Sequence, residues 1–396
     1  MSAKPHDDAR IRDWAAVRRL LAVRLDAMGD VLMTTPALHA AKAACPERHI
    51  TLLTSSGGAD AARLAPDVDD VIVYDAPWVK ATETRADAGL DRRMIRRLAA
   101  GRFDAAVIFT VYSQNPLPAA MLCYLADIPR RLAHCRENPY QLLTDWIPER
   151  EPDRGVRHEV ERQLDLVAAV GWRATDRRMR IAVPDAAATR VAERLAALGL
   201  DTHTSWAVLH PGASAPSRRY PSERFGAVVR TLASEHGWRF VLTGSRDEIP
   251  LIERVRAAAP ARTFSLGGEL SLAELAALIR CAPLLISNNT GPVHIAAAVG
   301  TPVVDLYALT NPQHTPWLVP SRVLFRDVPC APCYRSVCPE RYNLCLTGVT
   351  PQQIVEAALE LVRAEPRTRH GTQEVSIDAS MFDADARHAS VAEGTR

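Results

Sequence analysis

The sequence predicts an α/β protein built from two blocks of doubly wound parallel sheet. Short apolar runs rich in Val, Ile and Leu alternate with longer stretches of helical spacing, which is typical of parallel sheets that carry helices on both faces. The alternation occurs once over residues 17–185 and again over residues 200–350. A chain of 396 residues is long enough for each block to bury its own core.

The first block opens with an apolar run at residues 18–25, which predicts a strand, and a helix is expected over residues 31–44. Pro36 lies in the first turns of that helix, where a missing N–H is tolerated. Further strands are expected at residues 50–54, 71–74, 105–109 and 131–134, with helices at 59–64, 91–99 and 117–125. Residues 136–157 are rich in Pro and charge, and are interpreted as a boundary region.

The second block follows two helices expected at residues 158–170 and 186–198. Its strands are expected at residues 206–210, 239–243, 284–286 and 303–307, and its helices at 222–235, 248–258, 272–281 and 292–299. A final helix is expected over residues 351–364. Residues 1–16 are expected to form a flexible leader, and the polar residues 366–396 a disordered tail.

Composition excludes some classes of protein. The net charge of +2 argues against a general nucleic-acid binder. The N-terminus lacks a signal-peptide pattern and no apolar run is long enough to span a bilayer, so we expect a cytoplasmic protein. Arg greatly outnumbers Lys, 45 to 3, so Arg is expected at positions where related chains use Lys.

Candidate functional residues stand directly after predicted strands, where open α/β sheets bind ligands. After the first strand, Asp26 and Asp30 flank Gly29, which permits a sharp turn and a close approach of substrate. Asp30 opens the following helix, so a helix cap is the alternative to a catalytic carboxylate.

Residues 287–294 read as strand, polar loop and helix start, an arrangement that binds anions and phosphates through free N–H groups. Thr290 offers a hydroxyl, Gly291 a close approach to the backbone, and His294 lies one turn into the helix. The alternative is an ordinary strand–helix turn.

Two more loops follow strands of the second block. Arg218 and Arg219 lie between strand and helix, where cleft-facing phosphate contacts are found, and a solvated loop is the alternative. Asp247 and Glu248 could bind ribose hydroxyls or could cap a helix. The phosphate loop of kinases and the glycine fingerprint of dehydrogenases are both absent, as is G-x-S-x-G.

Taken together, these motifs resemble glycosyltransferase family 9, the lipopolysaccharide heptosyltransferase family. The stretch RLDAMGDVLMTTPAL at residues 24–38 is similar to the family's opening motif, and residues 210–221, 242–248 and 287–294 match later motifs in order. The resemblance covers about residues 18–364. It implies the GT-B architecture, with an acceptor-side domain (17–185) facing a nucleotide-sugar domain (200–350). It also implies that the final helix packs back toward the first domain.

The resemblance implies a role for each matched residue. Asp30 matches the general base, Arg218 a phosphate-binding Lys, and Glu248 the residue that holds the ribose. The diphosphate loop is matched by Thr290, Gly291 and His294. Asn289 stands where relatives usually carry Asp, which leaves the donor preference open.

An inverting sugar transfer needs a base for the acceptor hydroxyl and positive charge or N–H donors on the leaving diphosphate. The resemblance therefore implies transfer of a sugar, such as heptose from ADP-heptose, to a lipopolysaccharide-type or other membrane-linked glycan at the cytoplasmic face of the inner membrane. No Asp-x-Asp motif stands where it could hold a metal, so we expect catalysis without a cofactor. The alternatives are a sugar-nucleotide epimerase or hydrolase, and a non-catalytic nucleotide-sugar-binding protein.

Two clusters of like residues lie outside these motifs. Four of the eight cysteines crowd into sixteen residues, at Cys330, Cys333, Cys338 and Cys345. We interpret them as reduced structural thiols; zinc or an iron–sulfur cluster is the alternative, and disulfides are disfavoured in the cytoplasm. Four arginines between residues 92 and 97 form a basic helical cluster that could touch anionic lipid or acceptor phosphates, or simply face solvent.

Overall fold

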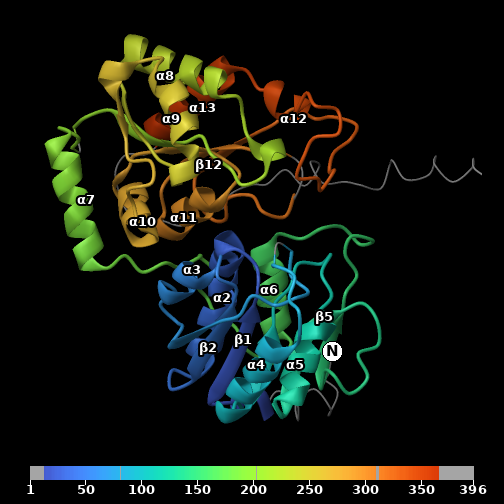
Figure 1. Ribbon diagram of the computed structural model, residues 1–396. Coiled ribbons are helices and arrows are strands. Elements are labelled where there is room, and N and C mark those ends of the chain that lie inside the picture. Colours follow the sequence, from blue (N-terminus) through green and yellow to red (C-terminus); the bar gives the residue numbers. More distant parts are fainter. Residues whose placement is uncertain (1–12, 81, 202, 309–311, 365–396) are drawn as a thin grey trace, which may run out of the picture.

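The computed structural model describes residues 13–80, 82–201, 203–308 and 312–364. It contains two parallel six-stranded sheets, one in each half of the chain, and Figure 1 shows the two halves stacked one above the other. The predicted pair of doubly wound parallel sheets is therefore confirmed.

The N-terminal sheet has the strand order β3-β2-β1-β4-β5-β6. Its strands are β1 (Arg19–Arg24), β2 (His49–Thr54), β3 (Asp70–Val73), β4 (Ala105–Ile108), β5 (Arg130–Cys135) and β6 (Asp145–Pro148). Its helices are α2 (Met28–Ala44), α3 (Ala59–Arg63), α4 (Gly89–Ala100), α5 (Leu117–Leu125) and α6 (Glu159–Ala168). Alternate residues of β1 pack into apolar cores on opposite faces of the sheet. Leu20 and Ala22 face α2 and α6, whereas Leu21 and Val23 face α4 and α5.

The C-terminal sheet repeats this order as β12-β11-β10-β7-β8-β9. Its strands are β7 (Trp206–His210), β8 (Arg239–Leu242), β9 (Thr263–Ser265), β10 (Leu285–Asn288), β11 (Val303–Leu306) and β12 (Ser321–Leu324). Its helices are α7 (Asp185–Ala197), α8 (Ser222–His236), α9 (Ile249–Arg256), α10 (Leu272–Cys281), α11 (Gly291–Val299), α12 (Leu344–Thr347) and α13 (Pro351–Ala364). The order reverses between β1 and β4 and between β7 and β10, and ligands bind at such reversals.

The strands that the sequence did not predict are β6, β9 and β12, and all three lie at sheet edges. An edge strand is paired on one side and partly exposed, so it lacks the continuous apolar run that marks a central strand. Residues 136–157 were expected to be a boundary region. That expectation is wrong for residues 145–148, because β6 pairs in parallel with β5.

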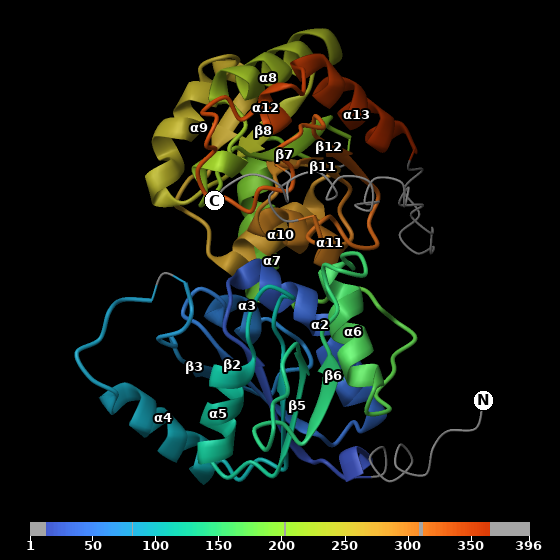
Figure 2. The same ribbon diagram turned by 90° about the vertical axis from the view of Figure 1, so that its right-hand side faces the viewer.

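Two further expectations are corrected at the ends of the described chain. Residues 13–16 do not form a flexible leader: Trp14 is buried edge-on against Trp172, and its Nε1 donates to Asp145 at 3.1 Å. Residues 1–12 and the expected tail from 366 onward lie outside the described residues. The final helix, α13, does not pack toward the first half. It lies against α8, β11 and β12 because its buried face, which includes Ile354 and Leu361, completes the core of the second half (Figure 2).

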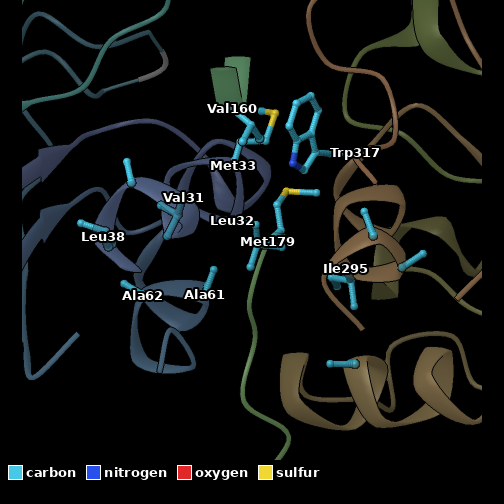
Figure 3. Packing of buried hydrophobic residues seen from close by; sticks show 14 of the residues in the cluster. Val31, Leu32, Met33, Leu38, Ala61, Ala62, Val160, Met179, Ile295 and Trp317 are labelled. Atoms are coloured by element: carbon cyan, nitrogen blue, oxygen red, sulfur yellow. The ribbon is translucent and has the colours of Figure 1, made fainter. Parts of the chain in front are cut away.

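The two halves share one continuous apolar core. Figure 3 shows Met33, Val160, Met179 and Trp317 gathered between α2 and the second half. Trp317 also stacks on His158 with ring centroids 4.5 Å apart. Among the described residues no helix is both long and apolar enough to cross a bilayer.

Candidate active site

The loops that follow β1 and β10 meet where the two halves touch, because α2 and α11 pack against each other. A Cβ on Gly29 of α2 would lie 2.7 Å from His294 Cδ2, and a Cβ on Gly291 would lie 1.9 Å from Met28 Cε. The sequence predicted that these glycines admit a ligand. In this structure each admits a side chain from the opposite half.

Asp30 is the third residue of α2 and not its cap. The cap position is Ala27, whose side chain makes no cap hydrogen bond. The Asp30 carboxylate instead accepts a 3.0 Å hydrogen bond from Arg24 Nη2, and its side chain remains 20% exposed. A carboxylate that is fixed by a buried partner but still reachable from solvent suits a general base.

Arg24 is a residue of the site that sequence reasoning missed. It is fully buried and pairs with three carboxylates: Asp30, Asp26 at 3.0 Å and Glu159 at 2.8 Å. Burial alone would lower the pKa of Arg24, but the three carboxylates raise it. Burial also raises the pKa of Asp26, and so does the nearby charge of Asp30. The available signal was a basic residue at the end of an otherwise apolar strand.

Arg218 and His294 lie close enough to interact electrostatically. Burial, together with the smaller effect of the Arg218 charge, lowers the pKa of His294 to about 4. His294 is therefore neutral near pH 7, so Arg218 supplies the positive charge of this pair. The Arg219 side chain is instead bonded to its own loop, because its Nε donates to the carbonyl of Ala213 at 2.6 Å. The structure thus favours Arg218 over Arg219 as the phosphate-binding cation.

Thr290 occupies the cap position of α11, and its side chain makes no cap hydrogen bond there. The first turn of this nine-residue helix is therefore uncapped by a side chain, which favours an anion at its N-terminus. Gly291 and His294 belong to the same helix, so the predicted diphosphate loop is assembled as a unit.

The Asn289 side chain is buried and hydrogen-bonded within the protein. Its Nδ2 donates to Asp305 Oδ2 at 2.8 Å and to the carbonyl of His314 at 2.9 Å, so both amide hydrogens are used. Asp305 is fully buried, and burial raises its pKa to about 8. An Asp at position 289 would place a second carboxyl against Asp305, which explains why an amide stands here.

Glu248 serves as a cap as well as a site candidate. Its carboxylate accepts from the backbone N–H of Ser245 at 2.9 Å in a reciprocal capping box. The same carboxylate lies 3.9 Å from His210 Nε2 and so close to Gly212 that any side chain there would collide with it. The loops after β7 and β8 are thus brought together.

A small pocket lies in the N-terminal half. Its volume is about 110 Å³, and Gln114, Asn115, Arg136 and Glu137 are among its lining residues. Gln114 Nε2 donates to Asp26 Oδ1 at 2.6 Å, which links the pocket to the Arg24 cluster. These residues follow β4 and β5 and were not singled out from the sequence.

The cysteine-rich loop, residues 326–345, lies against the Arg218 loop. Ser217 donates through its Oγ to the carbonyl of Arg335 at 2.7 Å, and the tip reaches the first half where the hydroxyls of Tyr334 and Tyr112 are 2.7 Å apart. All four cysteines are free thiols. Within the described residues, no three His, Cys, Asp or Glu side chains are grouped so that they could hold a metal ion.

Comparison with known proteins identifies the family. The sequence profile of glycosyltransferase family 9 (heptosyltransferase) matches residues 91–343. Lipopolysaccharide heptosyltransferase 1 of Pseudomonas aeruginosa is 28% identical over 369 residues, which cover 88% of this chain and 99% of the relative.

Solved structures agree on the fold. A family 9 glycosyltransferase from Veillonella parvula superimposes with a TM-score of 0.74 at 22% identity, covering 88% of this chain and 98% of that one. Escherichia coli heptosyltransferase WaaC, solved with ADP-2-deoxy-2-fluoro heptose, gives 0.65 at 21% identity over 86% and 99%. The predicted GT-B architecture is thereby confirmed. Because the profile covers more than half of the chain, the protein belongs to glycosyltransferase family 9, the heptosyltransferase family, and is a glycosyltransferase.

Proposed function

We propose that this enzyme transfers heptose from ADP-heptose to a lipopolysaccharide-type glycan, with Asp30 as the general base. The observation that carries the proposal is the contact between α2 and α11, which brings the Asp30 loop beside the anion-binding loop of the second half. The choice of sugar and nucleotide is supported by the relatives, which include a lipopolysaccharide heptosyltransferase and a structure with an ADP-heptose analogue.

In the proposed reaction the acceptor hydroxyl oxygen attacks the anomeric carbon while the bond from that carbon to the diphosphate oxygen breaks. The hydroxyl proton passes to Asp30, and ADP leaves with the bonding electron pair. Arg24 holds Asp30 through its 3.0 Å hydrogen bond and so fixes the direction of proton transfer. Attack from the face opposite the leaving group inverts the anomeric centre.

The donor would be held by groups of the second half. Arg218 would neutralise the diphosphate, the first turn of α11 at Thr290 and Gly291 would donate N–H groups to it, and neutral His294 would add a hydrogen bond. Glu248 would accept from the ribose hydroxyls. Because these groups supply the positive charge and the donors that the leaving diphosphate needs, we propose transfer without a metal.

The acceptor would lie on the N-terminal half, beside Asp30 and the small pocket that Gln114 lines. Glycans of the lipopolysaccharide type are anchored in a bilayer, so we propose that the reaction takes place at the cytoplasmic face of the inner membrane.

The proposal is tested by incubating the purified enzyme with ADP-heptose, with and without lipopolysaccharide truncated before its heptose residues, and measuring ADP release. Release that depends on the acceptor is expected. Release at the same rate without acceptor would indicate a hydrolase instead, and no release with any acceptor would contradict the choice of donor.

Donor binding gives a second, independent measurement. Arg218→Ala should weaken ADP binding roughly tenfold or more, because a charged hydrogen bond to phosphate contributes about 1.5–3 kcal/mol. Arg219→Ala is the matched control, since Arg219 is bonded to its own loop. Equal effects of the two substitutions would contradict the assignment of Arg218.

A further inference from the structure

Helix α5 has two apolar faces although it lies on the surface. Its sequence, LPAAMLCYL, contains no charged residue. Ala119, Leu122 and neighbouring residues are buried against the sheet, yet Met121, Tyr124 and Leu125 remain 43%, 43% and 50% exposed. A surface helix of a globular protein normally turns polar residues outward, so folding alone does not account for the outer face of α5.

Helix α4 lies beside α5 on the same face of the sheet (Figures 1 and 2). It buries Met94 and Leu98 and presents four exposed arginines on its opposite side. These are Arg92, Arg93, Arg96 and Arg97. Within the described part of the chain, none of the four pairs with a carboxylate, and the nearby Asp91 is already bonded to Tyr74 and Arg85.

The arginines of α4 and the apolar side chains of α5 together limit the kinds of partner that could bind this surface. A row of arginines alone is an ordinary solvated face, and an apolar ridge alone would suit a second copy of the chain. Exposed Met, Tyr and Leu next to four exposed guanidinium groups match an anionic bilayer. Apolar side chains enter the boundary between headgroups and acyl chains there, and guanidinium groups bind the lipid phosphates.

We propose that the α4–α5 surface, formed by Arg92, Arg93, Arg96, Arg97, Met121, Tyr124 and Leu125, docks the enzyme onto an anionic phospholipid bilayer. The surface belongs to the N-terminal half, and α5 directly follows the loop in which Gln114 contacts Asp26. Docking there would hold the acceptor-side half at the bilayer surface in which the proposed acceptor is anchored. This purpose rests on the proposed bilayer-anchored acceptor, but the binding itself does not.

The test measures co-sedimentation of the full-length enzyme with vesicles, without donor or acceptor. Binding is expected to vesicles of phosphatidylethanolamine with phosphatidylglycerol, and not to phosphatidylcholine alone, and should weaken at high salt. The double variant Arg96→Ser, Arg97→Ser should bind roughly thirty-fold more weakly. The double variant Met121→Ser, Leu125→Ser should bind roughly tenfold more weakly, since it removes apolar area that enters the bilayer.

The matched control is Arg230→Ser, Arg254→Ser, which removes the same charge from exposed positions on α8 and α9. It should change binding by less than about threefold. Failure of the wild-type enzyme to bind the anionic vesicles, or equal losses in control and α4 variants, would overturn the proposal. So would a dimer in sedimentation velocity that Met121→Ser, Leu125→Ser dissociates, since a second copy would then cover α5. Because no turnover is measured, these results are independent of the proposed reaction.

Discussion

The carboxylate of Asp30 can be assigned a role because its local bonds are specified. It does not cap α2, and its carboxylate is bonded to Arg24, which also holds Asp26 and Glu159. A helix-cap role therefore does not explain Asp30. What remains is either an ion pair that only stabilises the fold or a base that Arg24 positions, and substitution separates the two.

Asp30→Asn should keep an oxygen that accepts from Arg24 while losing the ability to take a proton. Arg24 would retain two carboxylate partners, so stability should change by less than about 1 kcal/mol. Turnover should fall roughly a hundredfold or more, with donor binding unchanged. Asp26→Asn is the matched control, because it removes the same charge from the same arginine. If both variants turned over normally, Asp30 would not be the base.

The buried carboxyl group of Asp305 makes the free energy of unfolding depend on pH. Burial raises its pKa from the ordinary 3.8 to about 8, opposed only by the hydrogen bond from Asn289. Between these values the folded protein keeps a proton that the unfolded chain releases. The contribution of Asp305 to the free energy of unfolding therefore falls as pH rises through this window.

Asp305→Asn abolishes that titration and keeps an acceptor for Asn289. From about pH 5 to about pH 9 the variant should gain stability relative to the wild type, with an upper bound of roughly 5 kcal/mol. Denaturant unfolding at several pH values measures this difference, and Asp127→Asn at an exposed position is the control. A difference that stays constant with pH would show that Asp305 is ionised throughout.

Among the elements of the fold, the cysteine-rich loop is held in place by hydrogen bonds. Its two ends are joined, because Arg326 N donates to the carbonyl of Cys345 at 2.8 Å. Its middle is held beside the Arg218 loop by the hydrogen bond from Ser217. Burial raises the pKa of Cys345, and the charges of Cys333, Cys338 and Cys330 raise it further. This arrangement favours a structural role.

Cys333→Ser should therefore lower stability by roughly 0.5–3 kcal/mol and leave the turnover of the folded enzyme nearly unchanged. Cys330→Ser, at an exposed position, is the milder comparison. Elemental analysis of both preparations reports whether the thiols carry zinc or iron. Loss of turnover in Cys333→Ser with normal folding and donor binding would contradict a structural role.

At the scale of the whole molecule, the sequence predicted the repeated strand–helix pattern because central strands and amphipathic helices carry strong periodic signals. It predicted the site loops because they follow central strands. It did not predict β6, β9 and β12, which lie at edges, nor the side on which α13 packs. Asp305 and Gln114 were missed because their importance comes from partners distant in sequence, which no local pattern records. Arg24 had a local signal, a basic residue that ends an apolar strand, but its pairing with Glu159, 135 residues away, could not be read from the sequence.

The closeness of the two halves gives a last prediction. Each half places a glycine against the other, and a Cβ on Gly29 would lie 2.7 Å from Cδ2 of the buried His294 ring. Gly29→Ala must therefore displace His294 or separate α2 from α11. Overpacking of this kind costs about 1–3 kcal/mol, and displacement of His294 should also weaken ADP binding.

Thermal unfolding and ADP titration of Gly29→Ala measure both effects. Gly57→Ala is the matched control, because a Cβ there meets only Ser55 Oγ at an ordinary 3.6 Å. If Gly29→Ala unfolded and bound ADP like the control, the halves would not be held at this separation in solution. The contact between α2 and α11 would then form only during the reaction cycle, and the base and the donor loop would be brought together by closure of the two halves.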